Sequence, residues 1–300
     1  MQASDTGTTQ TKTGQELWQK YCGHMDLDIQ QFMGIQRRLL EEQLDLYGRS
    51  GLGKVFFGET PVKSMEEFRE RVPLTTYSDY LPYLSDRRED LLPLKPRVWA
   101  RTSGRSGYYS VKWVPYTEGM YRAAGLASIS AFVMGAARWR GDFRMEPGDV
   151  LLATFAPAPY ISGAVMAPAI AEEFPLKVIP PLKESEGVSF EERVRWGFKL
   201  ALTEGIDHFV GLGSVLVRTA ELLSSGLRPP GGGSGRRLPP PAALWRIARG
   251  MVRSKLARRP LYPRDLWKLK SIIVVGMDTT AYADAITMYW GVKPIEGYGC

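Results

Sequence analysis

Four short apolar runs in the second half of the chain constrain its fold more than any other feature. Helix-like stretches near 163–173, 189–204 and 214–224 separate these runs, and another lies near 280–290. The runs are DVLLATF (149–155), LKVIPPL (176–182), HFVGLG (208–213) and SIIVVG (271–276). Apolar strands that alternate with helices are typical of a parallel sheet covered on both faces. The sequence therefore predicts an α/β fold, with a largely parallel β-sheet flanked by helices.

The first part of the chain is predicted to be mainly helical. Apolar residues recur at helix-like intervals over 14–47, and a glycine-containing stretch at 48–53 interrupts them. Ser64, with Glu67 three residues later, predicts a capping box that opens a short helix. A further helix is expected over 118–135.

The composition limits the classes of protein to consider. Of the 300 residues, 44% are hydrophobic and 24% are charged, so the chain can bury a sizeable core. No apolar run reaches the roughly 18 residues of a membrane span, and the N-terminus lacks the apolar stretch of a signal peptide. Cys22 and Cys300 form no disulfide framework, and His208 is expected to be structural. A cytoplasmic protein is therefore expected.

Two segments differ in composition from the rest of the expected domain, which spans 15–300 after a disordered tail at 1–14. Residues 224–243 are rich in glycine and proline and are predicted to form a flexible, exposed loop. Residues 245–270 hold nine Lys or Arg against one acid, which gives this segment a charge of +8. No nucleic-acid motif accompanies them, so no nucleic-acid partner is expected. The segment is interpreted as a solvated helix exposed on its Arg/Lys side, with an anionic membrane surface or an acidic partner as the alternative.

A polar glycine loop lies in RTSGRSGYYSVKWVPYT (101–117). Its glycines allow a ligand to approach the main chain, and its amides, hydroxyls and cations suit an anion such as a di- or triphosphate. The loop is neither a Walker motif nor a dinucleotide fingerprint, because GxxxxGK[ST] and GxGxxG are both absent. A plain hairpin turn with polar residues is the alternative interpretation.

Several motifs in order resemble those of the adenylate-forming superfamily. The loop, with Lys112 soon after it, resembles the phosphate loop of that superfamily, and VPYT (114–117) resembles its continuation in phenylacetate-CoA ligases and auxin-responsive amido synthetases. The other matching segments are VPLTTYSDYLPYL (72–84), FAPAPYISG (155–163), FVGLGSVLV (209–217), LKSIIVVGMDTT (269–280) and IEGYGC (295–300). The resemblance runs from about residue 64 to the end of the chain.

Two departures from the family pattern stand out. Arg105 replaces a small hydroxyl residue, so it either strengthens phosphate binding or fills the site. The chain also stops at Cys300, where the family continues with a hydroxyl residue, a glutamate that helps to hold Mg²⁺, and a C-terminal domain with a catalytic lysine. The expectation is the truncated N-terminal domain of an adenylate-forming enzyme, inactive by itself.

The resemblance implies that the full enzyme activates a carboxylic acid with ATP and Mg²⁺ to an acyl-adenylate and transfers the acyl group to an amine. A CoA acceptor, as in phenylacetate-CoA ligases, and an inactive remnant that binds nucleotide or a membrane surface are the alternatives. Lys112 is the implied catalytic residue, and no metal ligand is assigned. The implied nucleotide-binding residues are Thr102, Ser103, Gly104, Arg105, Ser106, Gly107, Gly276, Met277, Asp278, Tyr298 and Gly299. Strand termination by Gly276, helix capping by Asp278 and core packing by Tyr298 stay open as simpler readings.

Overall fold

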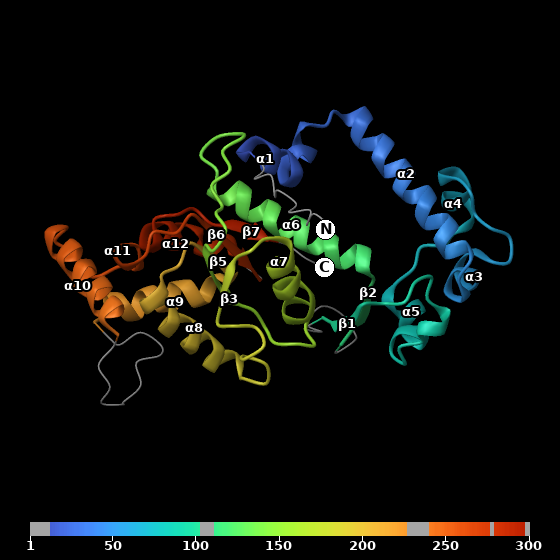
Figure 1. The fold of residues 1–300 in the computed structure, drawn as a ribbon. Helices are drawn as coiled ribbons and strands as arrows, with labels where there is room; N and C mark the ends of the chain where they lie inside the picture. The colour runs from blue at the N-terminus through green and yellow to red at the C-terminus, as the bar shows by residue number, and fades with distance from the viewer. Residues whose placement is uncertain (1–12, 103–110, 227–239, 277–278, 298–300) are drawn as a thin grey trace, which may run out of the picture.

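Five parallel strands form the central sheet of the structure, a computed structural model that describes residues 13–102, 111–226, 240–276 and 279–297 (Figure 1). All neighbouring strands pair in parallel. In spatial order the strands are β4 (Lys177–Ile179), β3 (Val150–Thr154), β5 (His208–Leu212), β6 (Ser271–Val275) and β7 (Ile295–Gly297). The predicted α/β fold is confirmed. The four apolar runs supply the first four of these strands, and β7 is an addition that the sequence analysis did not predict.

The strand order reverses once along the chain. The connection after β3 leads to β4 on one side, and the chain then returns to β5 on the other side of β3. Because all strands are parallel, their carboxyl ends lie at one edge of the sheet. Open α/β sheets bind ligands at this edge, in the crevice beside the strand pair where the order reverses. The fold therefore directs attention to the ends of β3 and β5.

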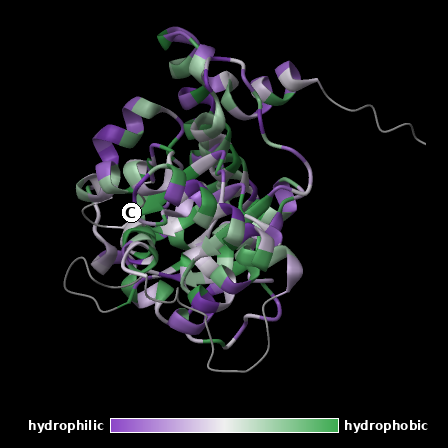
Figure 2. Ribbon diagram, turned by 90° about the vertical axis from the view of Figure 1, so that its left-hand side faces the viewer, coloured by the Kyte–Doolittle hydropathy of each residue, from purple (hydrophilic) through white to green (hydrophobic). Residues whose placement is uncertain are grey.

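Helices cover both faces of the sheet. One core cluster joins Leu151 and Ala153 of β3 to helices α1 (Gly14–Cys22), α6 (Glu118–Ala136) and α7 (Ala167–Glu173). The other joins Leu152 to α8 (Phe190–Glu204), α9 (Gly213–Ser224) and α12 (Ala283–Trp290). Alternate side chains of β3 therefore pack against the helices on opposite faces of the sheet. Hydrophobic residues are prominent in the centre of the molecule in Figure 2.

A separate group of helices lies to one side of the sheet (Figure 1). It consists of α2 (Ile29–Gly48), α3 (Gly51–Phe57), α4 (Met65–Arg71) and α5 (Tyr77–Leu84). The prediction that 14–47 is mainly helical is confirmed, although the chain turns between α1 and α2. Asp28 caps α2 by accepting a hydrogen bond from the Gln31 amide at 2.8 Å, while the Gln31 side chain accepts one from the Asp28 amide.

Other local predictions have mixed outcomes. Ser64 caps α4 by accepting from the Glu67 amide, but the Glu67 carboxylate accepts from Lys63, so the capping box is half formed. The tail and the Gly/Pro loop fall mostly on residues 1–12 and 227–239, which lie outside the described residues. At their boundaries Thr13 caps α1, and α10 (Pro241–Leu256) already begins within the predicted loop.

The basic segment is only partly exposed as predicted. Three of its arginines are directed inward: Arg246 donates to the Leu202 carbonyl, Arg253 to the Asp265 carbonyl, and Arg259 forms a two-bond ion pair with Asp265. This ion pair lies at α11 (Pro263–Leu266), which packs beside α10. Within the described part of the chain, no helix is both long and apolar enough to cross a membrane.

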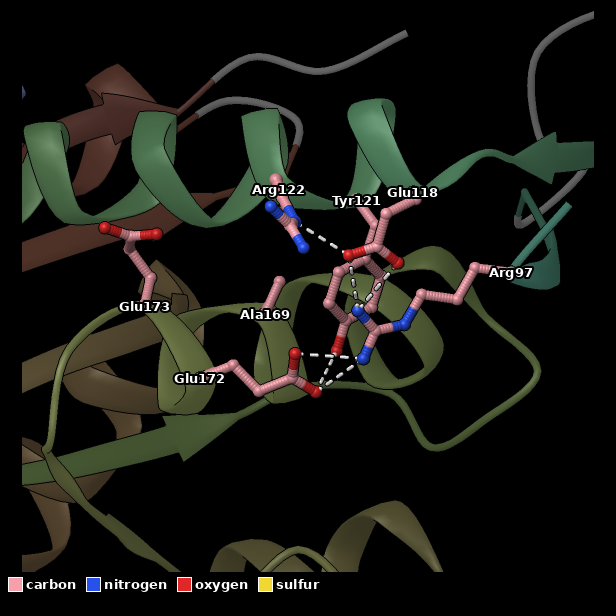
Figure 3. Close-up of a pocket in the computed structure, with 7 residues that line it drawn as sticks. All are labelled: Arg97, Glu118, Tyr121, Arg122, Ala169, Glu172 and Glu173. Atoms are coloured by element: carbon pink, nitrogen blue, oxygen red, sulfur yellow. Dashed lines mark hydrogen bonds and ion pairs between the residues drawn. The ribbon is translucent and has the colours of Figure 1, made fainter. Parts of the chain in front are cut away.

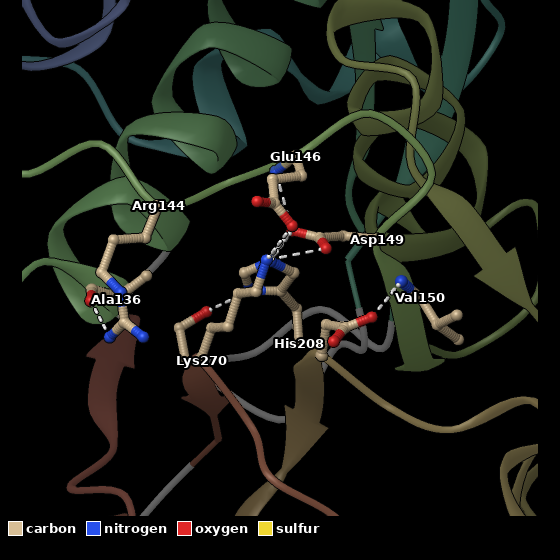
Figure 4. A network of polar contacts seen from close by, with 9 residues as sticks. Ala136, Arg144, Glu146, Asp149, Val150, His208 and Lys270 are labelled. Carbon is tan, nitrogen blue, oxygen red and sulfur yellow. Dashed lines mark hydrogen bonds and ion pairs between the residues drawn. The ribbon is translucent and has the colours of Figure 1, made fainter. Parts of the chain in front are cut away.

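A buried polar network joins the amino ends of three strands (Figure 4). His208 lies within 2.7 Å of the Ser271 hydroxyl and 3.1 Å of Asp149, and Lys270 donates to Asp149 at 2.8 Å. Burial of Asp149 opposes its ionisation, but the hydrogen bonds from His208, Lys270 and the Glu146 amide lower its pKa to about 2. The network lies at the edge opposite the strand carboxyl ends, so its geometry agrees with a structural role for His208.

Buried polar groups near the carboxyl ends of the strands lack such partners. Gly197 of α8 packs on Leu152 and Pro180, and Arg193 lies one turn nearer the strand ends. Arg193 is 7% exposed, and its Nε has no hydrogen-bond partner among the described residues. Burial lowers the pKa of its guanidinium. A buried cation without a partner destabilises the fold.

Thr154, the last residue of β3, has a buried hydroxyl that is also without a partner among the described residues. It pairs with Gly211 of β5, where a Cβ would lie 1.8 Å from the Thr154 Oγ1. Only glycine fits at position 211, because the threonine hydroxyl occupies the space of a side chain there. The two strands at the reversal point thus meet around an unsatisfied hydroxyl.

Replacing Asp149 tests the network at the amino ends of the strands. Asp149→Asn is expected to lower the free energy of unfolding by about 2 kcal/mol at neutral pH. A carboxylate with a lowered folded-state pKa stabilises the fold above its unfolded pKa of about 4, and this contribution is lost as pH falls towards about 2. Urea unfolding of both proteins across this range should show the difference shrinking with acid. The exposed substitution Asp86→Asn is the control, and an unchanged difference at low pH would contradict the assignment.

Replacing Arg193 tests whether it is truly unpaired. Arg193→Met keeps the length of the side chain and removes the buried charge, so it is expected to raise the free energy of unfolding by about 1–3 kcal/mol. Arg195→Met, on the exposed side of the same helix, should change it by less than about 0.5 kcal/mol. Denaturant unfolding measures both values. Destabilisation by Arg193→Met would show that the guanidinium has a partner.

Candidate active site

A two-stranded antiparallel hairpin holds the glycine loop. Strand β1 (Val98–Arg101) pairs with β2 (Trp113–Tyr116), and the Thr102 amide donates to the Lys112 carbonyl at 3.0 Å just beyond the last pair. Thr102 and Lys112, both predicted site residues, therefore face each other at the base of the loop. The other predicted loop residues, Ser103, Gly104, Arg105, Ser106 and Gly107, lie outside the described residues.

The hairpin contacts the segment that follows β3. The Arg101 amide donates to the Pro159 carbonyl at 2.9 Å, and Arg101 forms an isolated parallel bridge with Tyr160. The Arg101 guanidinium also lies 4.5 Å from the centre of the Tyr160 ring. Because this segment leaves the carboxyl end of β3, the contacts bring the base of the glycine loop to the ligand-binding edge of the sheet.

A surface ion-pair network fixes the other end of the hairpin (Figure 3). Arg97, just before β1, pairs with Glu118 of α6 at 3.1 Å and Glu172 of α7 at 2.7 Å, and lies 3.7 Å from the Tyr121 ring centre. Burial, together with the hydrogen bond to Glu172, raises the pKa of Tyr121 to about 12. These contacts attach the hairpin to both helices.

The cavity beside this network, about 380 Å³, is larger than the one at the strand ends but is not our candidate site. Its carboxylates already have partners: Glu118 and Glu172 pair with Arg97, and Glu173 pairs with Lys20. Side chains that satisfy one another in this way hold structural elements together and offer little to a ligand. We therefore assign the cavity to the attachment of the hairpin.

A smaller cavity, about 100 Å³, lies at the carboxyl ends of β5 and β6. Gly276, a predicted site residue, is exposed there with a φ of +129°. Helix α9 begins at Gly213 directly after β5, and none of the described side chains caps it. The first amides of an uncapped helix favour an anion through their free N–H groups and the helix dipole. The residues that line the cavity are Leu212, Gly213, Ser214, Val275, Gly276, Thr279 and Tyr282.

Lys112 is held near helix α5. Its Nζ lies 5.6 Å from the centre of the Tyr77 ring and forms no ion pair with the described residues. The Tyr77 hydroxyl accepts a hydrogen bond from the Trp113 amide at 2.8 Å, so α5 contacts the backbone of the hairpin itself. A lysine placed at the base of an anion-binding loop without a carboxylate partner is available to a phosphate.

The structure thus brings the described members of the predicted site to one edge of the sheet, at two places: Thr102 and Lys112 on the hairpin, and Gly276 in the strand-end cavity. Met277, Asp278, Tyr298 and Gly299 lie outside the described residues. Among the described residues, no group of three or more His, Cys, Asp or Glu is placed to hold a metal ion.

Sequence reasoning missed several residues of this edge. Ser214 and Gly213 fall within FVGLGSVLV, where a strand passes into a helix without a turn, and this junction is a usable signal. Thr279 falls within LKSIIVVGMDTT but was not singled out there, and Tyr282 lies two residues beyond that motif. Burial of Arg193 could be predicted only from its spacing, because it lies on the same buried face of the helix as Gly197 and Phe198.

Comparison with known proteins gives a family and a set of similar structures. Residues 23–163 match the GH3 family N-terminal domain. No curated protein matches the chain. The structure is similar to 2-hydroxyisobutyryl-CoA ligase in an open conformation in complex with 2-HIB-AMP and CoA: identity is 16%, the TM-score is 0.47, and the match covers 89% of this chain and 52% of that one. The same ligase in the postadenylation state with 2-HIB-AMP is also similar: identity is 16%, the TM-score is 0.47, and the match covers 96% of this chain and 47% of that one.

The chain therefore spans about half the length of the solved chains it resembles. The match at 23–163 includes α2 to α5, the hairpin and the segment after β3 that the hairpin contacts. It agrees with the resemblance to the amido synthetases that VPLTTYSDYLPYL and the glycine loop indicated. Residues 23–163 of this chain are similar to the GH3 family N-terminal domain.

Proposed function

We propose that the protein activates a carboxylic acid with ATP to form an acyl-adenylate, and that the acyl group then passes to an amine. The observation that carries the proposal is the contact of the hairpin with the end of β3, through the Arg101 amide and the Pro159 carbonyl. This contact brings the base of the glycine loop, Thr102 and Lys112, towards the edge of the sheet where α/β proteins bind nucleotides.

Positive groups at the same edge support a site for phosphate. Lys112 at the base of the loop and the uncapped start of α9 both favour anions. Arg193, whose buried Nε lacks a partner among the described residues, adds a third positive group on the α8 side of the strand ends. Adenylate formation brings together two anions, a carboxylate and a triphosphate, so a concentration of positive groups suits it.

The proposed roles follow the resemblance position by position. The loop from Thr102 to Gly107, with Lys112, would bind the β- and γ-phosphates of ATP. Gly276, Met277 and Asp278 would lie against the adenosine, and Tyr298 with Gly299 would flank the adenine. Mg²⁺ would arrive with ATP, coordinated mainly by phosphate oxygens and water, as is usual for this ion.

Adenylate formation and acyl transfer require the protein mainly to position the reactants. A carboxylate oxygen attacks the α-phosphorus, the bond to the leaving pyrophosphate breaks, and acyl-AMP forms. The amine nitrogen then attacks the acyl carbon, loses a proton and displaces AMP. Orientation of the reactants and neutralisation of phosphate charge supply the acceleration. An amine is proposed as acceptor because VPLTTYSDYLPYL and the segment after the glycine loop resemble the amido synthetases, and CoA is the alternative acceptor.

Calorimetric titration with Mg·ATP tests the binding of nucleotide. We expect the chain to bind, and Lys112→Gln to weaken binding by about ten- to a hundredfold, because a charge-assisted hydrogen bond contributes about 1.5–3 kcal/mol. Lys199→Gln, an exposed lysine on α8, is the matched control and should bind like the wild type. Absence of binding heat at millimolar nucleotide, or an equal loss in the control, would refute the assignment of the loop.

A second test addresses the strand-end cavity. Gly276→Ala places a methyl group where the adenosine is expected, so affinity for ATP should fall about tenfold, which corresponds to about 1.4 kcal/mol. Gly141→Ala shares the strain of a positive φ at an exposed site but lies far along the chain, before β3. Thermal unfolding should show similar stability losses for both variants. Equal ATP affinity in both would show that Gly276 does not contact the nucleotide.

A further inference from the structure

Helix α10 packs through one face and exposes the other. Its buried side, Ala243, Gly250 and Ser254, lies against its neighbours α8 and α11. On the opposite side Trp245 is 71% exposed, Val252 57% and Leu256 80%. The spacing of seven and then four residues places these three side chains in one row along the helix. The row is the centre of the exposed face, where a solvated helix would carry polar residues.

Cations flank this apolar row. On the helix, Arg249 lies to one side of the row and Lys255 to the other, and Arg258 follows directly after the helix. All three are exposed, and none forms an ion pair with the described residues. The inward-directed Arg246, Arg253 and Arg259 are already engaged, so the exposed cations are the part of the +8 segment that is available to a partner.

We propose that α10 binds the surface of an anionic lipid bilayer. The row of Trp245, Val252 and Leu256 would enter the interface, while Arg249, Lys255 and Arg258 would contact lipid phosphates and carboxylates. An amphipathic helix of this kind lies in the plane of the membrane interface, and tryptophan favours that depth. Basic residues beside it gain from the negative surface potential of anionic lipids.

Charge distinguishes this occupant from the alternatives. A second copy of the chain bound through the same face would place its cations against identical cations, which is unfavourable. Helix α2 also exposes apolar residues, including Ile29, Phe32 and Met33, but its arginines are matched by Glu41, Glu42 and Asp45. Helix α10 lies at the opposite end of the molecule from α2 (Figure 1), so a flat surface can approach it there.

Co-sedimentation with vesicles tests the proposal on the whole chain. We expect binding to vesicles of phosphatidylcholine mixed with phosphatidylserine, and little binding to phosphatidylcholine alone. The triple variant Trp245→Ser, Val252→Ser, Leu256→Ser and the triple variant Arg249→Gln, Lys255→Gln, Arg258→Gln should each lower the partition coefficient by about tenfold or more. High salt should weaken wild-type binding, since it screens the charges.

A matched control uses exposed residues of the same types elsewhere. Trp139→Ser, Val55→Ser and Leu74→Ser together should leave the partition coefficient within about twofold of the wild type, because they remove equal apolar surface away from α10. Equal loss in this control, equal binding to both kinds of vesicle, or no binding at all would overturn the proposal. So would a dimer in sedimentation equilibrium that the α10 apolar variant alone converts to monomer, because the face would then bind a second copy.

Discussion

The parallel pairing of β3 with β5 is the constraint on which the rest of this structure depends. Parallel neighbours cannot be joined by a tight turn, so each connection crosses the sheet through a helix and every strand ends at the same edge. The strand order reverses at this pair, and the Thr154 hydroxyl occupies the space beside Gly211 there. The start of α9 and Gly276 at the end of β6 lie at this edge because the strands are parallel, and the hairpin contacts it through Pro159.

The two edges of the sheet differ in how their buried polar groups are paired. At the amino ends Asp149 lies within hydrogen-bond distance of both His208 and Lys270, and the lowered pKa of Asp149 shows that these contacts favour its charged form. Near the carboxyl ends Thr154 and Arg193 have buried polar atoms without partners in the described chain, which lowers stability. Unsatisfied groups gathered at the edge where ligands bind are consistent with a trade of stability for binding.

Much of the fold was predictable from sequence because apolar strands and amphipathic helices carry periodic signals. DVLLATF and SIIVVG became β3 and β6 with bounds shifted by only a residue or two. The break between α1 and α2 escaped prediction because Asp28 and Gln31 cap a helix without disturbing the apolar spacing around them. The hairpin contact with Pro159 escaped it too, since a backbone hydrogen bond between distant segments leaves no trace in residue type.

Residues of the candidate site were predictable only where a motif or an unusual residue type marked them. Gly276 was predicted from the resemblance of LKSIIVVGMDTT to the family, and the loop after Thr102 from its glycines and hydroxyl residues; both stay predictions. Arg193 was not identified, because an arginine in an amphipathic helix usually points to water. Composition counted nine cations in the basic segment but could not tell which are exposed: the structure turns three arginines inward and exposes Trp245.

The contacts of α5 with the hairpin couple the two parts mechanically. Tyr77 bonds to the backbone of Trp113, and the Arg87 guanidinium, just beyond α5, lies 3.9 Å from the centre of the Trp113 ring. The helices that stand apart from the sheet therefore hold the stem of the glycine loop as well as their own small core. A molecule that bound the helices and shifted α5 would tilt this stem relative to β3. Binding at the helices and binding at the strand ends would then change each other's affinity by the same factor.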